Sequence, residues 1–272
     1  CYVCADGAQV LMLSQRFQDY GRRRIMETTQ FLLDVLDEGS LEPGGYGLRS
    51  IQKIRLLHAT VRHHVVKVPT WNHAWGLPIN QEDLAGTMLT FAVLAPRAIE
   101  QLGADLTHDQ RESFVHVWKV IGSMLGLDDR LLPDSYDHAT QLLNRILERN
   151  QRTSEAGVQL TKALLEVLAD IIPGTIVDGI PASLIRFFAG DTFAEMLGVP
   201  EANWTRHLIP PIRGASYLAD KLGDNSPRLA NFFKLFGNRL LKRTFQAIKG
   251  PNRYEWRIPK SIHEQWNVGM RQ

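Results

Sequence analysis

The sequence predicts an all-α protein, a single globular domain of about eight to ten helices. Apolar residues recur at the three- and four-residue spacing of a helix face, and no stretch shows the alternation of a strand. Turn and capping residues separate segments of helical length. The 272 residues contain no repeat or long linker. We therefore expect one domain over residues 1–272, with an N-terminal segment at 1–20 and an aromatic, basic C-terminal strap at 251–272.

Turn chemistry delimits the first two expected helices. Residues 22–37 place Ile25, Leu32 and Leu36 on one apolar stripe, and the glycine-rich stretch 37–47 ends this helix. A second helix covers residues 48–67. It stops before Pro69, since the residue that precedes a proline is disfavoured in the helical region.

Capping residues set the next boundaries. Asn80 is a good N-cap with acidic residues in the following turn, and Thr107 begins another helix in the same way. Gly126 is the expected stop of that second helix. The expected helices after residue 67 cover 80–101, 107–125, 135–150, 154–171, 181–197, 201–223 and 226–248.

Composition argues against several classes of protein. The net charge is +2 and basic residues are spread along the chain, so we expect no nucleic-acid partner. No stretch approaches the ~18 uninterrupted apolar residues of a transmembrane helix. Cys1 and Cys4 form a CxxC without the second pair of a zinc ribbon, and Ala5 stands where a c-type haem attachment requires histidine. Because the chain begins at Cys1 rather than Met, we expect a trimmed or processed end, from which any export signal was lost.

The helix expected over residues 48–67 contains several basic residues among mostly apolar ones. His58 lies at the centre of an apolar face, with Arg55 and Arg62 one turn before and after it. A haem satisfies this pattern, because its iron takes an imidazole and its propionates take guanidinium groups. A core histidine with internal Arg–carboxylate pairs explains the pattern equally well. His63 and His64 are expected on the solvated face.

A second polar group lies on the preceding helix. Arg24, Glu27 and Thr28 share one face by spacing. They form either a surface edge with an Arg–Glu pair or a polar rim that points into a cofactor pocket. The chain has no GxSxG, Walker A, dinucleotide, HExxH or paired Glu-x-x-His motif, so hydrolase, nucleotide and di-iron interpretations have no motif behind them.

Four long, ordered motifs resemble the latex clearing proteins. These are rubber oxygenases, b-type haem proteins of all-α fold, and their superfamily includes a fungal oxygenase that cleaves a farnesyl side chain. The likeness extends from about Arg22 to Trp266. The motifs are LEPGGYGLRSIQKIRLLHATVRHH, W-x-x-x-WGLPINQEDLAGTMLTF, HVWKVIGSMLGLDDRLLP and ASLIRFFAGDTFAEMLGVP.

This resemblance implies a set of cofactor-binding residues. In the frame R-x-x-H-x-x-x-R, His58 matches the proximal ligand of the haem iron. Arg55 and Arg62 match the two arginines of that frame beside the haem, and Arg186 matches a further family arginine.

The resemblance also implies a distal side, where this chain departs from the family. Arg24 and Thr28 match polar residues of the distal helix. Glu27 stands where a characterised relative has a lysine that can cap the iron. The family's upstream glutamate has no clear counterpart, since only Asp6 and Asp19 are available. Arg24, Glu27 and Thr28 are thus the expected catalytic residues, with Glu27 as a candidate base for an allylic proton.

The implied activity is that of a dioxygenase that uses haem b and O₂. It cleaves the carbon–carbon double bonds of an isoprenoid such as poly(cis-1,4-isoprene) to aldehyde and ketone ends. The alternatives are a haem-dependent oxygenase or hydroxylase of another small molecule, and a non-catalytic haem sensor or carrier. We expect a monomer with an apolar small-molecule substrate. Its location is left open: secreted if it is like the latex clearing proteins, and otherwise cytoplasmic.

Overall fold

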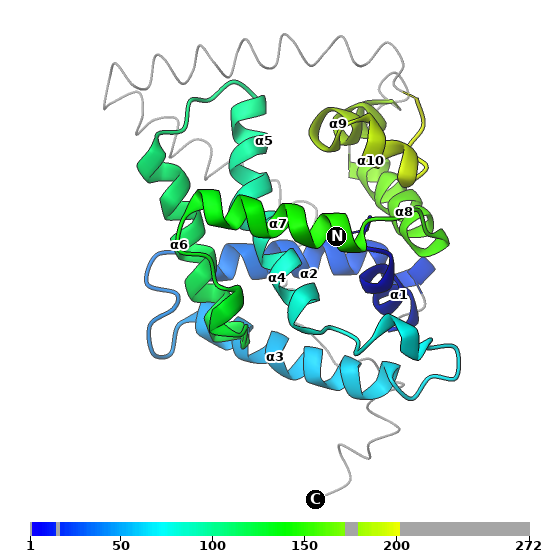
Figure 1. The fold of residues 1–272 in the computed structure, drawn as a ribbon, viewed down its shortest axis with the longest axis horizontal. Coiled ribbons are helices and arrows are strands. Elements are labelled where there is room, and N and C mark those ends of the chain that lie inside the picture. The colour runs from blue at the N-terminus through cyan, green and yellow to red at the C-terminus, as the bar shows by residue number, and fades with distance from the viewer. Residues whose placement is uncertain (1, 15–16, 172–178, 202–272) are drawn as a thin grey trace, which may run out of the picture.

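A computed structural model of the chain describes residues 2–14, 17–171 and 179–201 (Figure 1). Over these residues the protein is helical, and the only backbone pairing of β type is an isolated bridge between Cys4 and Gln151. The expected all-α class is confirmed. None of the helices in these ranges is both long and apolar enough to cross a membrane.

The described residues form ten α-helices. They are α1 (Ala5–Leu13), α2 (Phe17–Val35), α3 (Tyr46–Val65), α4 (Gln81–Leu89), α5 (Ala95–Gln101), α6 (His108–Leu125), α7 (Tyr136–Asn150), α8 (Glu155–Ile171), α9 (Ile180–Ala189) and α10 (Asp191–Met196).

The local signals at helix ends worked as expected. Asn80 accepts a hydrogen bond from the backbone N–H of Asp83, whose side chain binds the Asn80 backbone N–H in return. Thr107 and Gln110 form the same reciprocal capping box at the start of α6. Gly126 ends α6 in the left-handed region, with φ of 91°.

Two expected helices are divided in the structure. The segment expected over 80–101 contains a π-helical stretch, Thr90–Leu94, which ends two residues before Pro96. Proline has no N–H to continue the α-helical ladder. The segment expected over 181–197 breaks at Gly190, where φ is 82°. The helices expected at 201–223 and 226–248 and the strap at 251–272 lie outside the described residues, so the single domain over 1–272 stays a prediction.

The largest core lies between α2, α3, α4, α6 and α7. Ile51, Leu89, Ile121 and Leu143 are fully buried there, each from a different helix. Figure 1 shows α2 passing through the middle of the molecule, with α3 along one side of it. This packing places one face of α2 against α3, and that contact contains the polar residues of interest.

A buried hydrogen-bond cluster and two glycines fix the register of α2 against α3. Asp34 of α2 accepts hydrogen bonds from Gln30 at 2.7 Å and from Ser50 of α3 at 2.5 Å. A Cβ atom on Gly45 would lie 2.0 Å from the carbonyl oxygen of Ser40, and one on Gly47 would lie 2.7 Å from the Oγ of Ser40. The connection therefore requires glycine, and the two helices run antiparallel from this point.

Candidate functional site

The centre of the candidate site is His58, on the part of α3 that faces α2. Burial lowers the pKa of its imidazole to about 4, and the positive charges of Arg62 and Arg24 contribute to that shift. The ring is therefore neutral at pH 7, which is the form that binds metals. No residue in the described ranges forms a hydrogen bond with it.

Arg24 approaches the same place from α2. Burial lowers the pKa of its guanidinium group, and the neighbouring Tyr2 and Glu27 oppose that shift. No residue in the described part of the chain accepts a hydrogen bond from it.

Tyr2 is a member of this group that the sequence did not indicate. Burial raises the pKa of its phenol, and Arg24 acts in the opposite direction. A long-range hydrogen bond fixes the segment that contains Tyr2, because the backbone N–H of Arg152 binds the carbonyl of Val3 at 3.0 Å. Nothing in the local pattern around Tyr2 predicts this long-range placement.

Glu27 is buried, with 4% of its surface exposed. It accepts a hydrogen bond from Nε of Arg23 at 2.8 Å. Burial raises the pKa of its carboxyl, while the hydrogen bond from Arg23 and the charges of Arg23 and Arg24 oppose the rise. The surface-edge alternative is wrong for this residue, and its hydrogen-bonded partner is Arg23 rather than Arg24. The i, i+4 spacing was the signal for that pair.

Thr28 does not share this environment. Its side chain is exposed, whereas Glu27 beside it is buried. The face expected to hold Arg24, Glu27 and Thr28 together is therefore divided between the interior and the surface.

The arginines that flank His58 bind backbone carbonyl groups. Arg62 donates from Nε to Pro78 at 3.2 Å and from Nη2 to Ile79 at 2.8 Å. Arg55 is exposed and donates to the carbonyl of Met124 at 3.0 Å, at the C-terminal end of α6. The expectation that Arg55 faces inward with His58 is wrong, because the carbonyl groups at that helix end attract its guanidinium.

Arg186 lies in a different part of the molecule. It binds the carbonyl oxygens of Pro200 at 2.7 Å and Val199 at 2.9 Å, and the carboxylate of Asp191 at 2.8 Å. Figure 1 shows its helix, α9, on the opposite side of the molecule from α3. The structure does not bring Arg186 to His58, and its three contacts join the start and the end of the α9–α10 segment.

The neighbouring histidines differ from each other. His63 is exposed, as expected, and its Nε2 lies 2.5 Å from Nζ of Lys67. His64 is half-buried rather than solvated.

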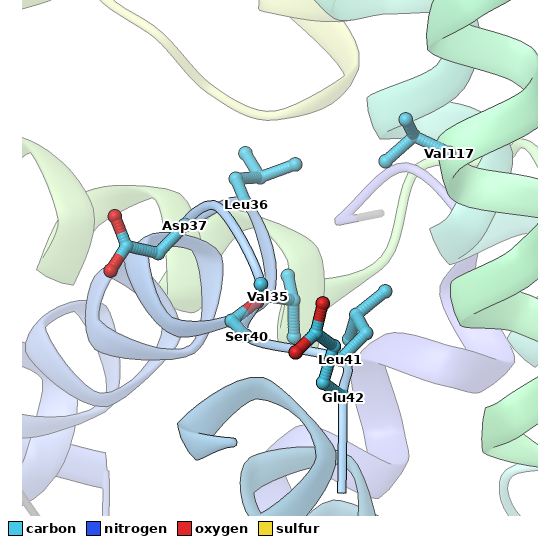
Figure 2. A pocket seen from close by; sticks show the side chains of 8 residues that line it. Val35, Leu36, Asp37, Ser40, Leu41, Glu42 and Val117 are labelled. Atoms are coloured by element: carbon cyan, nitrogen blue, oxygen red, sulfur yellow. The ribbon is translucent and has the colours of Figure 1, made fainter.

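An apolar surface hollow lies at the far end of α2. Figure 2 shows it between Leu36, the loop that follows it and Val117 of α6. Val35, which also lines it, is eight residues beyond Glu27, or roughly 12 Å along the helix. None of the expected site residues lines this hollow, so it is distinct from the group around His58.

The donor set around His58 can be compared with what a haem requires. A haem iron needs a single neutral imidazole from the protein, and its carboxylates favour guanidinium partners. His58 supplies the first, and Arg24 supplies a guanidinium without a protein acceptor in the described ranges. The residues present therefore fit a haem.

Over the described residues the protein is all-helical, with a neutral histidine at the centre of its candidate site, and comparison with known proteins identifies its family. A model of the family described as "ER-bound oxygenase mpaB/B'/Rubber oxygenase, catalytic domain" matches residues 5–217. The chain belongs to this family.

Two relatives illustrate the likeness. The chain is 28% identical over 189 residues to a rubber oxygenase of Streptomyces sp. (strain K30), a match that covers 68% of this chain and 46% of that protein. It also resembles the solved structure of latex clearing protein LCP in the closed state, with a TM-score of 0.65 and 24% identity over 80% of this chain and 63% of that one. The matched region thus spans less than half the length of the curated relative.

Proposed function

We propose that the protein is a haem b-dependent oxygenase that uses O₂ to cleave carbon–carbon double bonds of an isoprenoid such as polyisoprene, leaving aldehyde and ketone ends. The observation that supports this most is a neutral histidine without a hydrogen-bond partner in the described ranges, close to a half-buried arginine. Membership of an oxygenase family and likeness to a rubber oxygenase supply the reaction class.

In this proposal His58 is the axial ligand of the iron. Its low pKa keeps the imidazole unprotonated through the physiological range, so no proton has to leave when the metal binds. When bound, the haem supplies the activation of O₂. Arg24 supplies N–H donors for the cofactor's carboxylates, which Arg55 and Arg186 are less able to do because they bind other groups.

Glu27 is the proposed base for an allylic proton of the substrate. A raised pKa makes its carboxylate a stronger proton acceptor, and Arg23 holds one of its oxygens in place. Thr28, which the resemblance places on the same side, is exposed. Glu27 stands where a characterised relative has a lysine. In this proposal its carboxylate takes the place of the upstream glutamate, which has no clear counterpart in this chain.

The relatives and the apolar surroundings of α3 support the proposed substrate class. Val61 and Val65, one and two turns beyond His58, pack with Trp71 in an apolar cluster. A hydrocarbon chain is compatible with such a wall, whereas a strongly polar substrate would lose hydration beside it.

Reconstitution with haem and assay of O₂ uptake test this proposal. We expect the loaded protein to consume O₂ with a short polyprenol or polyisoprene latex and to release carbonyl products, and His58→Ala to do neither. His63→Ala is the matched control. Protein that binds haem without consuming O₂ would contradict the oxygenase and favour a sensor or carrier, and hydroxylated products of unchanged length would favour a hydroxylase.

A further inference from the structure

The turn before α4 contains an unusual backbone conformation. Ile79 has φ of 51°, and it is the only residue other than glycine with positive φ in the described ranges. A β-branched side chain is sterically disfavoured in this region, so such a residue persists only where its surroundings hold it.

Two oppositely charged side chains, Arg62 and Asp83, bind the backbone carbonyls and amides of this turn. Arg62 donates to the carbonyls of Pro78 and Ile79 at 3.2 and 2.8 Å. Asp83 accepts the backbone N–H of Asn80 at 3.1 Å, and the N–H of Ile79 is also directed at this carboxylate. The carbonyls of the turn are thus bound from α3 and its amides from α4.

The turn supports an apolar wall next to His58. The side chain of Ile79 is half-buried and packs on a cluster whose buried members are Val10, Val61, Val65 and Trp71. The ring of Trp71 meets that of Trp75 edge to face at 5.2 Å. Half-buried Leu57, which directly precedes His58, packs on the same cluster. Movement of the turn would therefore move the wall that borders the histidine.

We propose that Arg62 is a positioning residue: through the carbonyls of Pro78 and Ile79 it holds a strained turn, and the apolar wall behind it, against the helix that carries His58. This differs from the role that the family resemblance implies, in which Arg62 is a cation beside the haem. It rests on the proposed function, because the wall is inferred to guide an isoprenoid chain. Only an arginine fulfils this role, since its planar fork reaches two carbonyls at once.

A double-substitution cycle on the cofactor-free chain tests the clamp itself. The variants are Arg62→Met, Ile79→Gly and the pair, with Ile79→Val as the control that keeps a β-branched side chain at positive φ. We expect Arg62→Met to lower Tm by roughly 5 °C in the wild-type and Ile79→Val backgrounds. In the Ile79→Gly background we expect less than half of that shift, since glycine adopts positive φ without support. Equal shifts in all three backgrounds would overturn the inference.

Kinetics of haem-loaded Arg62→Lys then separate positioning from charge. Lysine keeps the positive charge but lacks the fork. We expect KM for a long polyprenol to rise about tenfold, with kcat and haem content within twofold of wild type. Wild-type KM in this variant would show that the charge alone matters and would overturn the positioning role. An inactive wild-type protein would instead overturn the proposed function, together with the inferred role of the wall in guiding substrate, while the Tm cycle still reports on the clamp.

Discussion

The two ends of the α2–α3 pair differ in how their polar side chains are satisfied. At the closed end, formed by Asp34, Gly45, Gly47 and Ser50, the buried carboxylate has hydrogen-bond donors at 2.5 and 2.7 Å, and glycines allow close backbone contact. At the open end, formed by Arg24, Glu27 and His58, two of the three side chains have no hydrogen-bond partner in the described ranges.

We infer from this difference that the closed end of the helix pair stabilises the fold and the open end binds a ligand. Asp34 is buried and has donors from both helices, whereas His58 and Arg24 are half-buried, so their polar groups stay within reach of a ligand. The closed end also contains the one buried side-chain polar atom of the described residues that has no hydrogen-bond partner, Oγ of Ser40. Substitutions at the closed end should therefore alter folding, whereas those at the open end should alter chemistry with little effect on folding.

The largest expected effect is on catalysis, at Glu27. We expect Glu27→Gln to lower kcat by about 100-fold or more, since the amide cannot accept the proton. Because burial raises the pKa of this carboxyl, wild-type activity should fall as pH drops through that raised pKa, and the variant should lack this limb. The measurement is a pH–rate profile at equal haem content, with exposed Glu38→Gln as the control. A profile unchanged in Glu27→Gln would exclude it as the base.

At the closed end the largest effect is expected for Gly45→Ala. The new Cβ would lie 2.0 Å from the Ser40 carbonyl oxygen, although φ of −65° suits alanine. We expect a loss of about 3 kcal/mol in the free energy of unfolding, measured by urea denaturation. Gly44→Ala is the control. It has φ of 86° with no atom within 4 Å, so it should lose only about 1–2 kcal/mol, from backbone conformation alone. A smaller loss for Gly45→Ala than for Gly44→Ala would contradict the close contact.

A smaller effect is expected for Ser50→Ala. It removes one donor from the buried Asp34 carboxylate and should cost about 1–2 kcal/mol of stability. The exposed Ser113, whose hydroxyl binds the carbonyl of Asp109 within α6, provides the control, and Ser113→Ala should change stability by less than about 0.5 kcal/mol. Equal effects would mean that the Asp34–Ser50 bond does not join the helices.

The smallest effect is the pH dependence of stability due to His58 in the cofactor-free protein. Its pKa is lowered from 6.5 to about 4 on folding, so between these values the unfolded chain takes up a proton that the folded one does not. Stability should therefore fall as pH decreases from 6.5 towards 4. Denaturation curves of His58→Gln should show less of this fall, and parallel curves for both proteins would show that the imidazole titrates normally.

Sequence reasoning succeeded where a structure is decided locally. The caps at Asn80 and Thr107 and the stop at Gly126 depend on side chains within three residues, and all three occur as expected. The break at Gly190 is not predicted, because glycine interrupts a helix only when the neighbouring packing favours it.

The site was less predictable because it depends on distant partners. Spacing places Arg55 beside His58, yet its direction is decided by the Met124 carbonyl at the end of α6. Tyr2 lies within the electrostatic influence of Arg24 although the two belong to different segments, and no local pattern indicates that placement. His58 itself is indicated by the sequence, because an apolar face with a histidine at its centre is a local signal.

The most direct test of the central claim, that His58 is the iron ligand, is the optical spectrum of the chain reconstituted with haem. We predict a Soret band of equal intensity in wild type and His63→Ala, and its loss in His58→Ala whose far-ultraviolet circular dichroism is unchanged. Addition of imidazole to His58→Ala should restore part of the band by replacing the missing ligand. A full, unshifted Soret band in His58→Ala without imidazole would contradict the account.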